Sequence, residues 1–309
     1  MFDLRQTMTP LITAACVLLA TAAPAAVPEG WTDDYPAAQA RAAAEGKDLL
    51  LDFTGSDWCV PCVALKQNVF DTPAFQSAVP QDFVLVQVDF PQNVVQPPAL
   101  AAQNRELYSR YQIPSFPTIV LTDPEGRPYG MTHFVPESPD PYLDLLEAFQ
   151  AQRAARDQAF ADAEIAEGTS RAQALDRAME AVGADLAVRH YADVVDEIIA
   201  ADPDNTAGLK AKYVALQRSV MIEAALQEAL ALLGTGNLGA GLERIDQIIA
   251  EYQPEPLQLQ LMIAIKGETQ FQLGETERAI ELFNEALGHA PESDLANQLR
   301  SILQQLESM

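Results

Sequence analysis

The stretch Ser56–Leu65 reads SDWCVPCVAL and holds two cysteines, Cys59 and Cys62, with two residues between them. Such a pair can bind a metal, staple the chain, or carry a redox disulfide. A structural zinc site needs about four ligands, but the third cysteine, Cys16, lies far upstream and the three histidines are scattered. A staple across so short a loop constrains the unfolded chain very little. Redox chemistry is therefore the leading interpretation.

The residues around the pair predict a strand, a turn and a helix. Lys47–Phe53 reads KDLLLDF, a short apolar run whose length and composition suit a buried strand. Thr54–Asp57 is a turn cluster, and a helical pattern follows to about Phe70. Cys59 is thus expected near a helix N-terminus, where free N–H groups and the helix dipole stabilise a thiolate. Pro61 suits the first turn, because its missing N–H costs nothing there.

The string LLLDFTGSDWCVPC resembles the active-site region of thioredoxin-fold proteins, especially a secreted bacterial branch. Phe83–Phe90, FVLVQVDF, resembles the central strand of that family. Ile113–Leu121, IPSFPTIVL, resembles its cis-proline segment, with Pro117 in the key position. The resemblance covers roughly residues 31–149 and implies an α/β thioredoxin fold, in which helices flank a central mixed sheet.

The resemblance also implies roles for the two cysteines. Cys59 would be the exposed attacking thiolate, and Cys62 the buried thiol that resolves the mixed disulfide. No metal and no cofactor is implied beyond the redox-active disulfide between them. The intervening Val60 and Pro61 resemble reducing thioredoxins, because oxidising and isomerase types usually carry a histidine that stabilises the thiolate by charge.

Four residues are implied to contact substrate. Pro117 would follow a cis peptide bond, so that the backbone of Phe116 and Pro117 faces the substrate beside the attacking cysteine. Thr118 would begin the next strand. Trp58 would pack over the rim of the site, with simple core packing as an equal alternative.

Asp52 aligns with a buried aspartate that, in thioredoxins, assists proton transfer from the resolving cysteine. It lies seven residues before Cys59, one more than is typical, and we expect the extra residue to bulge within Thr54–Ser56. Asp57 is the rival acid, although its position predicts an exposed loop carboxylate.

The rest of this half predicts supporting structure. Thr72 and Pro73 open a short helix as N-cap and first helical residue. The pattern of 97–111 indicates an amphipathic helix, and Asp123–Gly126 indicates a turn between two strands. His133 is expected on the second of these strands, as an ordinary edge-strand histidine rather than a catalytic one.

The N-terminus predicts export. In residues 1–26 Arg5 precedes an apolar run, Leu11–Ala20, and small residues follow, which is typical of a signal peptide cleaved near Ala25 or Ala26. The run is shorter than the roughly 20 apolar residues that span a bilayer, and an uncleaved membrane anchor is the alternative. We therefore expect a periplasmic or secreted protein.

The mature chain is long enough for two domains. We expect a thioredoxin-like domain at 27–150, a connecting helix at 151–168 and a helical domain at 169–309. The second half breaks at 168–170, 202–205, 234–236 and 253–254, and apolar residues recur at helical spacing between the breaks.

The last part of this half resembles a tetratricopeptide repeat. The matching positions are Gly267, Gly274, Ala279, Phe283, Ala286 and Pro291. It departs from that pattern at Gln270, where a large aromatic residue is expected, with Phe271 one place on. The resemblance implies an all-α tetratricopeptide-like array that docks a protein partner, or that only dimerises or thickens the fold.

The net charge and the expected export of the chain limit the classes of function that it can have. A formal net charge of −25 repels phosphate backbones, so no nucleic-acid partner is expected. The sequence predicts an exported thiol–disulfide oxidoreductase that reduces or isomerises disulfides of exported client proteins. A membrane thiol-transfer protein would supply its electrons. The alternative is a client-binding, chaperone-like protein in which redox activity is secondary, and metal delivery through the pair ranks last.

Overall fold

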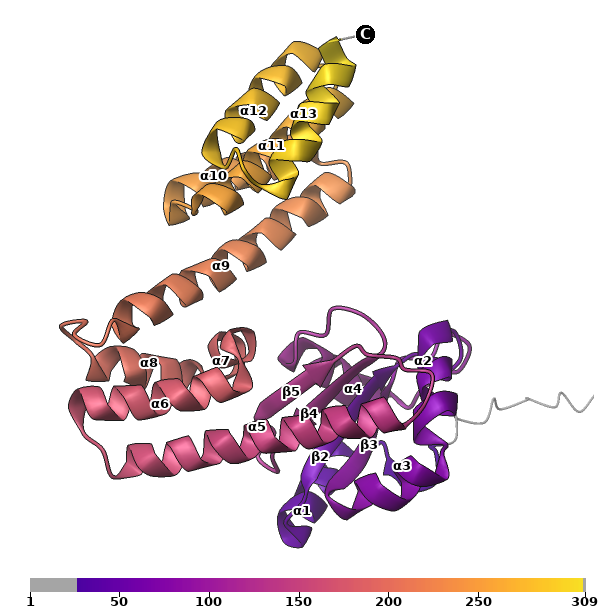
Figure 1. The fold of residues 1–309 in the computed structure, drawn as a ribbon. Coiled ribbons are helices and arrows are strands. Elements are labelled where there is room, and N and C mark those ends of the chain that lie inside the picture. The colour runs from indigo at the N-terminus through magenta and orange to yellow at the C-terminus, as the bar shows by residue number, and fades with distance from the viewer. Residues whose placement is uncertain (1–26, 308–309) are drawn as a thin grey trace, which may run out of the picture. The chain divides into compact units, whose positions relative to one another are not determined.

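The computed structural model describes residues 27–307, so the predicted signal peptide lies outside the described residues. The chain divides into two compact units, 1–147 and 148–309. The division falls within the long helix α5 (Asp140–Glu164), which starts before the predicted connecting segment (Figure 1). Across residues 27–307, no helix is both long and apolar enough to cross a membrane.

The first unit is built on a five-stranded mixed sheet with the order β1-β3-β2-β4-β5. Its strands are β1 (Trp31–Thr32), β2 (Asp48–Thr54), β3 (Phe83–Asp89), β4 (Thr118–Thr122) and β5 (Pro128–Thr132). β1 and β2 run parallel to β3, whereas β4 is antiparallel to both β2 and β5. The central strand is β2, so the expectation that Phe83–Phe90 holds that place is wrong. β1, which is only two residues long, is the strand that lies beyond β3 on one side of β2, while β4 and β5 both lie on the other side.

Helices cover both faces of this sheet. They are α1 (Tyr35–Glu45), α2 (Val60–Leu65) with a π-helical turn η1 (Lys66–Phe70), α3 (Pro73–Ala78), a 3-10 turn η2 (Val79–Gln81) and α4 (Pro98–Arg110). α1 and α4 pack on the face that carries Leu49, Leu51 and Phe53. On the other face, Trp31 and Tyr142 make ring contacts with Phe70. Burial on both faces explains why β2 reads as a continuous apolar run rather than an alternating one.

Two local predictions for this unit are confirmed. Thr72 caps α3, its hydroxyl accepting the N–H of Phe75, and proline occupies the first turn. Asp123–Gly126 forms the turn between β4 and β5, where Gly126 adopts a φ of 85° and donates its N–H to the Asp123 carbonyl. This left-handed conformation favours glycine.

After α5, the regular elements of the second unit up to residue 307 are all helices, as predicted. Its helices are α6 (Gly168–Val182), α7 (Ala184–His190), α8 (Ala192–Ala201), α9 (Leu209–Gly234), α10 (Leu238–Tyr252), α11 (Pro256–Gln272), α12 (Thr276–His289) and α13 (Asp294–Glu307). The breaks expected near 202, 234 and 253 are found. The break expected at 168–170 is present but lies slightly earlier, because α5 ends at Glu164 and α6 begins at Gly168.

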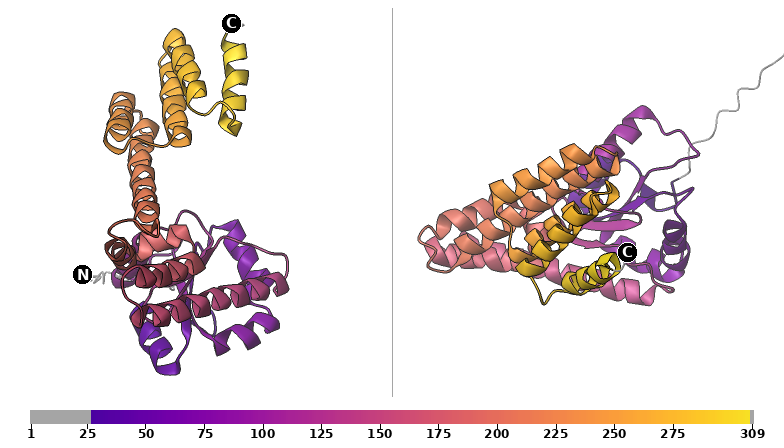
Figure 2. Two further views of the ribbon diagram at one scale, coloured as in Figure 1. Left: turned by 60° about the vertical axis from the view of Figure 1, so that its left-hand side comes forward. Right: turned by 90° about the horizontal axis from the view of Figure 1, so that it is seen from above.

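In this unit, helices that follow one another in the chain pack side by side. α9 contacts α10, and α11 lies beside α12 (Figure 2). Close approach within the second pair depends on Gly267, because a Cβ there would lie 2.7 Å from a ring carbon of Phe283. The apolar residues form separate clusters, one around Ile245 and Ile248 and another around Leu282 and Phe283. The tetratricopeptide-like character of this array stays a prediction.

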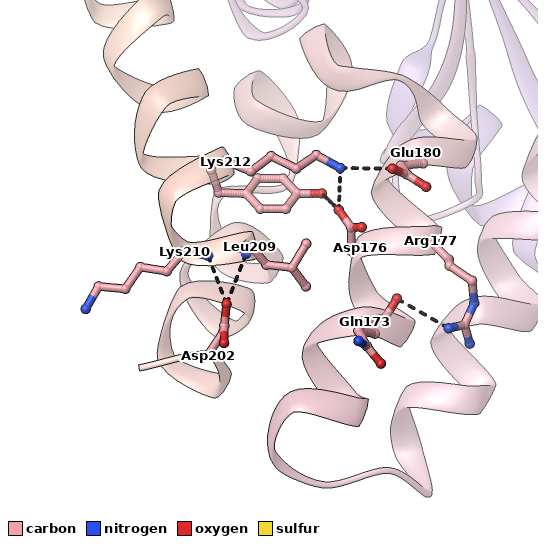
Figure 3. Close-up of polar contacts among 9 residues, drawn as sticks. Gln173, Asp176, Arg177, Glu180, Asp202, Leu209, Lys210 and Lys212 are labelled. Atoms are coloured by element: carbon pink, nitrogen blue, oxygen red, sulfur yellow. Dashed lines mark hydrogen bonds and ion pairs between the residues drawn. The ribbon is translucent and has the colours of Figure 1, made fainter. Parts of the chain in front are cut away.

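Polar contacts join α6 to α9 in the second unit (Figure 3). Lys212 pairs with Asp176 at 2.7 Å and Glu180 at 2.9 Å, and the Tyr213 hydroxyl donates to Asp176 at 2.7 Å. Asp202, which is buried before the start of α9, accepts the N–H groups of Ala207, Leu209 and Lys210. It therefore satisfies amides at the beginning of α9 that would otherwise have no partner.

Candidate active site

The cysteine pair lies at the predicted helix start. Cys59 is the N-cap of α2, with φ −84° and ψ 101°, and its sulfur accepts the Cys62 N–H at 3.3 Å. Pro61 occupies the first turn. A disulfide joins Cys59 to Cys62. The strand, turn and helix expected from the sequence are therefore present, and the structure shows the oxidised state of the pair.

The expected exposure of Cys59 is wrong for this oxidised state. Both cysteines are 4% exposed. The reason lies in the local geometry, because the Cys59 sulfur is bonded to Cys62 and turned toward the first turn of α2. The side chains of its neighbours Trp58 and Val60 are exposed to solvent instead. Cys62 is buried as predicted.

Asp52 lies on β2 and lines the same small cavity as Cys62. A cavity of about 120 Å³ is lined by both Asp52 and Cys62, together with Ser56 and Gln87. Asp52 is 7% exposed, and its Oδ1 atom has no hydrogen-bond partner among the residues the structure describes. The arrangement places a buried carboxyl and the second thiol around one small space.

Burial also sets the ionisation of this carboxyl. Desolvation, followed by the nearby charge of Asp89, raises the pKa of Asp52 to about 8. A carboxyl with such a pKa can take up or release a proton near neutral pH, close to the usual range of a cysteine thiol.

Asp57, the rival acid, has a structural role. Its carboxylate accepts the backbone N–H of Gln92 at 2.9 Å and that of Asn93 at 2.7 Å. These bonds hold the pKa of Asp57 below its usual range. Asp57 is exposed as expected, and it fixes the loop that follows β3 through its bonds to Gln92 and Asn93.

The turn between β2 and α2 takes up the extra residue of this chain. The pairing of β2 with β3 continues without interruption to Thr54, opposite Asp89. The extra residue therefore lies in the turn after Thr54, in agreement with its expected place within Thr54–Ser56. Asp89 holds this turn, accepting the Ser56 N–H at 2.9 Å and its hydroxyl at 2.6 Å. Cys59 then donates its N–H to the Gly55 carbonyl at 2.9 Å.

Four aromatic side chains form a ledge near the pair, which we call the aromatic ledge: Trp58, Phe90, Tyr108 and Phe116. Trp58 is 40% exposed and donates its indole N–H to the Phe90 carbonyl at 2.8 Å. The core-packing alternative for Trp58 is therefore wrong. Gly55 makes room for the indole, since a Cβ there would lie 2.5 Å from the ring.

The Phe116–Pro117 peptide bond is cis, as predicted. Thr118 begins β4, also as predicted, and donates its hydroxyl to the Ser115 carbonyl at 2.6 Å. His133 follows β5 rather than lying within it, and its Nδ1 is 2.8 Å from the Thr118 hydroxyl. Phe116 belongs to the aromatic ledge, so the Cys59 region and the proline segment are linked by the ring contact between Trp58 and Phe116, 5.9 Å between centroids.

These features coincide with a known family. The family model for thioredoxin-like domains matches residues 30–124, which include the cysteine pair, Asp52 and the cis-proline segment. The first unit contains a thioredoxin-like domain. The mixed sheet and flanking helices of this unit, and the helices of the second unit, agree with the fold class that the sequence predicts.

Curated relatives of the thioredoxin-like domain carry names from disulfide chemistry. Disulfide bond reductase DsbH of Chlamydia pneumoniae is 29% identical over 116 residues, covering 38% of this chain and 70% of that protein. Thioredoxin-related protein DsbJ of the same organism is 32% identical over 97 residues, but only 28% of it is covered. Thiol:disulfide interchange protein DsbD 2 of Pseudomonas aeruginosa is 38% identical over 87 residues, and 13% of it is covered.

A solved structure named DsbH oxidoreductase was also matched, with 26% identity and a TM-score of 0.37. The match covers 46% of this chain and 94% of that one. The sequence relatives, together with the disulfide of the thioredoxin-like domain, support thiol–disulfide oxidoreductase chemistry at the cysteine pair.

Some residues of the site were not predicted from the sequence. Asp89, Phe90 and Tyr108 reach it from β3, the loop after β3, and α4. The signal that could have found Asp89 is its place at the end of an apolar strand parallel to β2, where polar side chains of adjacent strands gather. Across residues 27–307, no group of three or more His, Cys, Asp or Glu side chains could hold a metal ion.

Proposed function

We propose that this protein is an exported thiol–disulfide oxidoreductase that reduces or isomerises disulfides in other exported proteins. The observation that carries the proposal is the Cys59–Cys62 disulfide at the start of α2, with the buried residues Asp52 and Cys62 lining one small cavity. The disulfide reductase name of a relative covered over 70% of its length supports the direction of reduction.

In the reduced protein, the Cys59 thiolate attacks one sulfur of a client disulfide. A mixed disulfide forms and the other client sulfur leaves as a thiolate. Cys62 then loses its proton and attacks the Cys59 sulfur, which releases the second client thiolate and closes the Cys59–Cys62 disulfide. Two electrons thereby pass to the client. Asp52, in its ionised form, is the group in the shared cavity suited to take the Cys62 proton.

The substrate contacts proposed are those of the resemblance: Trp58, Phe116, Pro117 and Thr118. Trp58 and Phe116 contribute to the aromatic ledge, and the peptide between Phe116 and Pro117 is cis. A further turnover needs two electrons to reopen the disulfide. We propose that a membrane thiol-transfer protein supplies them, a role suggested by the thiol:disulfide interchange name of the Pseudomonas aeruginosa relative.

Insulin reduction by the full mature chain tests the mechanism. The wild-type protein should reduce insulin disulfides with dithiothreitol as donor, and Cys59→Ser should fall to the background rate. Cys62→Ala should still attack but stall, so that mixed disulfides on Cys59 accumulate and identify clients and donor in the native cell. Activity of Cys59→Ser equal to wild type would refute the mechanism.

The helical unit favours a second candidate function, client holding. Two mainly apolar cavities, of about 420 and 440 Å³, lie along its helices, and Leu261 of α11 lines both. Leu261 is also among the exposed large apolar side chains. We propose that an unfolding client segment docks there before its disulfide reaches Cys59.

Aggregation assays separate the two functions. If holding is real, a double variant with both Cys59 and Cys62 changed to serine should still suppress aggregation of heated citrate synthase. Leu261→Glu should lose suppression while keeping insulin reduction. Loss of suppression in the double cysteine variant would instead tie every effect on clients to redox chemistry.

A further inference from the structure

His133 lies immediately beyond β5 and contacts the cis-proline segment from the neighbouring strand. The register that pairs Ile119 with Thr132 brings His133 opposite Thr118. Its Nδ1 atom is 2.8 Å from the Thr118 hydroxyl and 3.3 Å from the Pro117 carbonyl. One imidazole nitrogen thus contacts two consecutive residues of the segment proposed to meet substrate.

The hydrogen-bond partners decide which atom carries the proton. Thr118 has a single hydroxyl proton, and it is donated to the Ser115 carbonyl at 2.6 Å. The Thr118 oxygen can then only accept from His133. The Pro117 carbonyl can only accept as well. Both contacts of Nδ1 are therefore satisfied together only when Nδ1 carries a hydrogen and donates it.

We propose that His133 is a positioning residue for the client-binding segment, its Nδ1–H holding the Thr118 hydroxyl and the Pro117 carbonyl in place. The chain Nδ1–H to Thr118 Oγ1, and Thr118 Oγ1–H to the Ser115 carbonyl, spans residues on both sides of the cis peptide. His133 is itself exposed, so the contact adds little to core packing. It acts on substrate through Pro117 and Thr118, and this inference rests on the proposed function.

This role differs from acid–base catalysis in a way that can be measured. The neutral Nδ1–H tautomer and the protonated imidazolium both carry the required hydrogen. A positioning role therefore needs a donor at the Nδ1 position and no proton transfer. Asparagine can place its amide N–H near the position of Nδ1, whereas the longer glutamine places it near the position of Nε2.

The test compares three variants of the full chain in insulin reduction. His133→Asn should behave like wild type. His133→Gln and His133→Ala should raise KM by about two- to ten-fold, the range expected for one lost hydrogen bond, with kcat nearly unchanged. Equal KM in all four proteins would overturn the proposal. A fall in kcat shared by His133→Asn would also overturn it, because it would indicate proton transfer.

A second measurement does not depend on activity. Ring ¹⁵N chemical shifts of His133 at pH 8 should show a protonated Nδ1 and an unprotonated Nε2. The opposite tautomer would overturn the proposal even if the kinetics agreed. If the wild-type chain failed to reduce insulin, the proposed function would fall, while the ring shifts would still decide whether His133 holds the segment.

Discussion

Asp52 of the first unit and Asp202 of the second are both buried, but their pKa values are shifted in opposite directions. Asp52 of the first unit has an oxygen with no partner among the described residues, and desolvation raises its pKa to about 8. Burial acts on Asp202 of the second unit in the same direction, but the backbone N–H groups it accepts outweigh it and lower its pKa. A carboxylate matched to a helix start stabilises the fold, whereas one left without donors destabilises the fold and becomes available for proton transfer.

The two units also differ in how their apolar residues are packed. In the first unit one cluster joins α1, α4 and three strands of the sheet. In the second unit the clusters follow neighbouring helices, with ion pairs on the outside. Both tryptophans, Trp31 and Trp58, belong to the first unit, so tryptophan fluorescence reports on it selectively, while circular dichroism at 222 nm is dominated by the helical second unit.

The largest expected effect comes from Asp52→Asn. Since its folded pKa lies above its unfolded value, the native state holds a proton that the unfolded chain releases between about pH 4 and 8. Stability of the wild type should therefore fall as pH rises through this window and level off above it. The variant lacks this loss and should be more stable at pH 8.5, by roughly 5 kcal/mol.

Urea unfolding followed by tryptophan fluorescence at pH 5, 7 and 8.5 measures this effect. Insulin reduction by the same variant should fall at least about tenfold, because the proton acceptor is gone. Asp57→Asn is the matched control. It should neither change the dependence of stability on pH between pH 5 and 8.5 nor increase the free energy of unfolding at pH 8.5. An Asp52→Asn protein less stable than wild type at pH 8.5 would remove the contrast between the two aspartates.

A smaller effect is expected from Gly267→Ala in the second unit. The added Cβ would meet the buried ring of Phe283 at 2.7 Å, and overpacking of this kind costs about 1–3 kcal/mol. The melting transition at 222 nm should move down, while insulin reduction stays unchanged. Gly239→Ala, also helical but with open space around it, should instead gain about 0.5–1 kcal/mol. Equal behaviour of the two would mean that the packing of α11 on α12 is not tight.

Asp202→Ala should lower the melting temperature of the helical unit by about 3–6 °C, because three amides near the start of α9 lose their acceptor. The wild type should lose the same stabilisation as pH falls below the usual aspartate range, since a depressed pKa stabilises only above the unfolded value. Tryptophan fluorescence should not change. A matching shift in fluorescence would show that the two units unfold together.

The smallest effect on stability is expected from Gly55→Ala. The Cβ would lie 2.5 Å from the Trp58 ring, but the exposed indole can move aside, so the free energy of unfolding should change by less than about 1 kcal/mol. The displaced ring leaves the aromatic ledge, so KM for insulin should rise a few-fold. A KM like that of wild type would show that the ledge does not meet this substrate.

Local sequence signals predicted the elements of this chain well. Thr72 with Pro73, and the Asp123–Gly126 turn, act through contacts between near neighbours, so their outcome is readable from the sequence. The errors arose where the outcome depends on distant segments. The place of β3 depends on how far β1 extends the sheet, and β1 pairs with β3 through Trp31 and Leu85, which lie far apart in the chain.

The sequence by itself determined the redox pair, the strand and helix that carry it, the cis-proline segment and the helical character of the second half. The cis-proline segment was implied by the resemblance to thioredoxin-fold proteins, whereas the others follow from residue type at short spacing. Only the tertiary structure decided that Asp52 and Cys62 share a cavity, that the Cys59 sulfur is turned inward in the disulfide, and that His133 reaches Thr118. Desolvation, strand register and side-chain direction depend on segments far apart in the chain, and these become neighbours only when the sheet and its helices are packed.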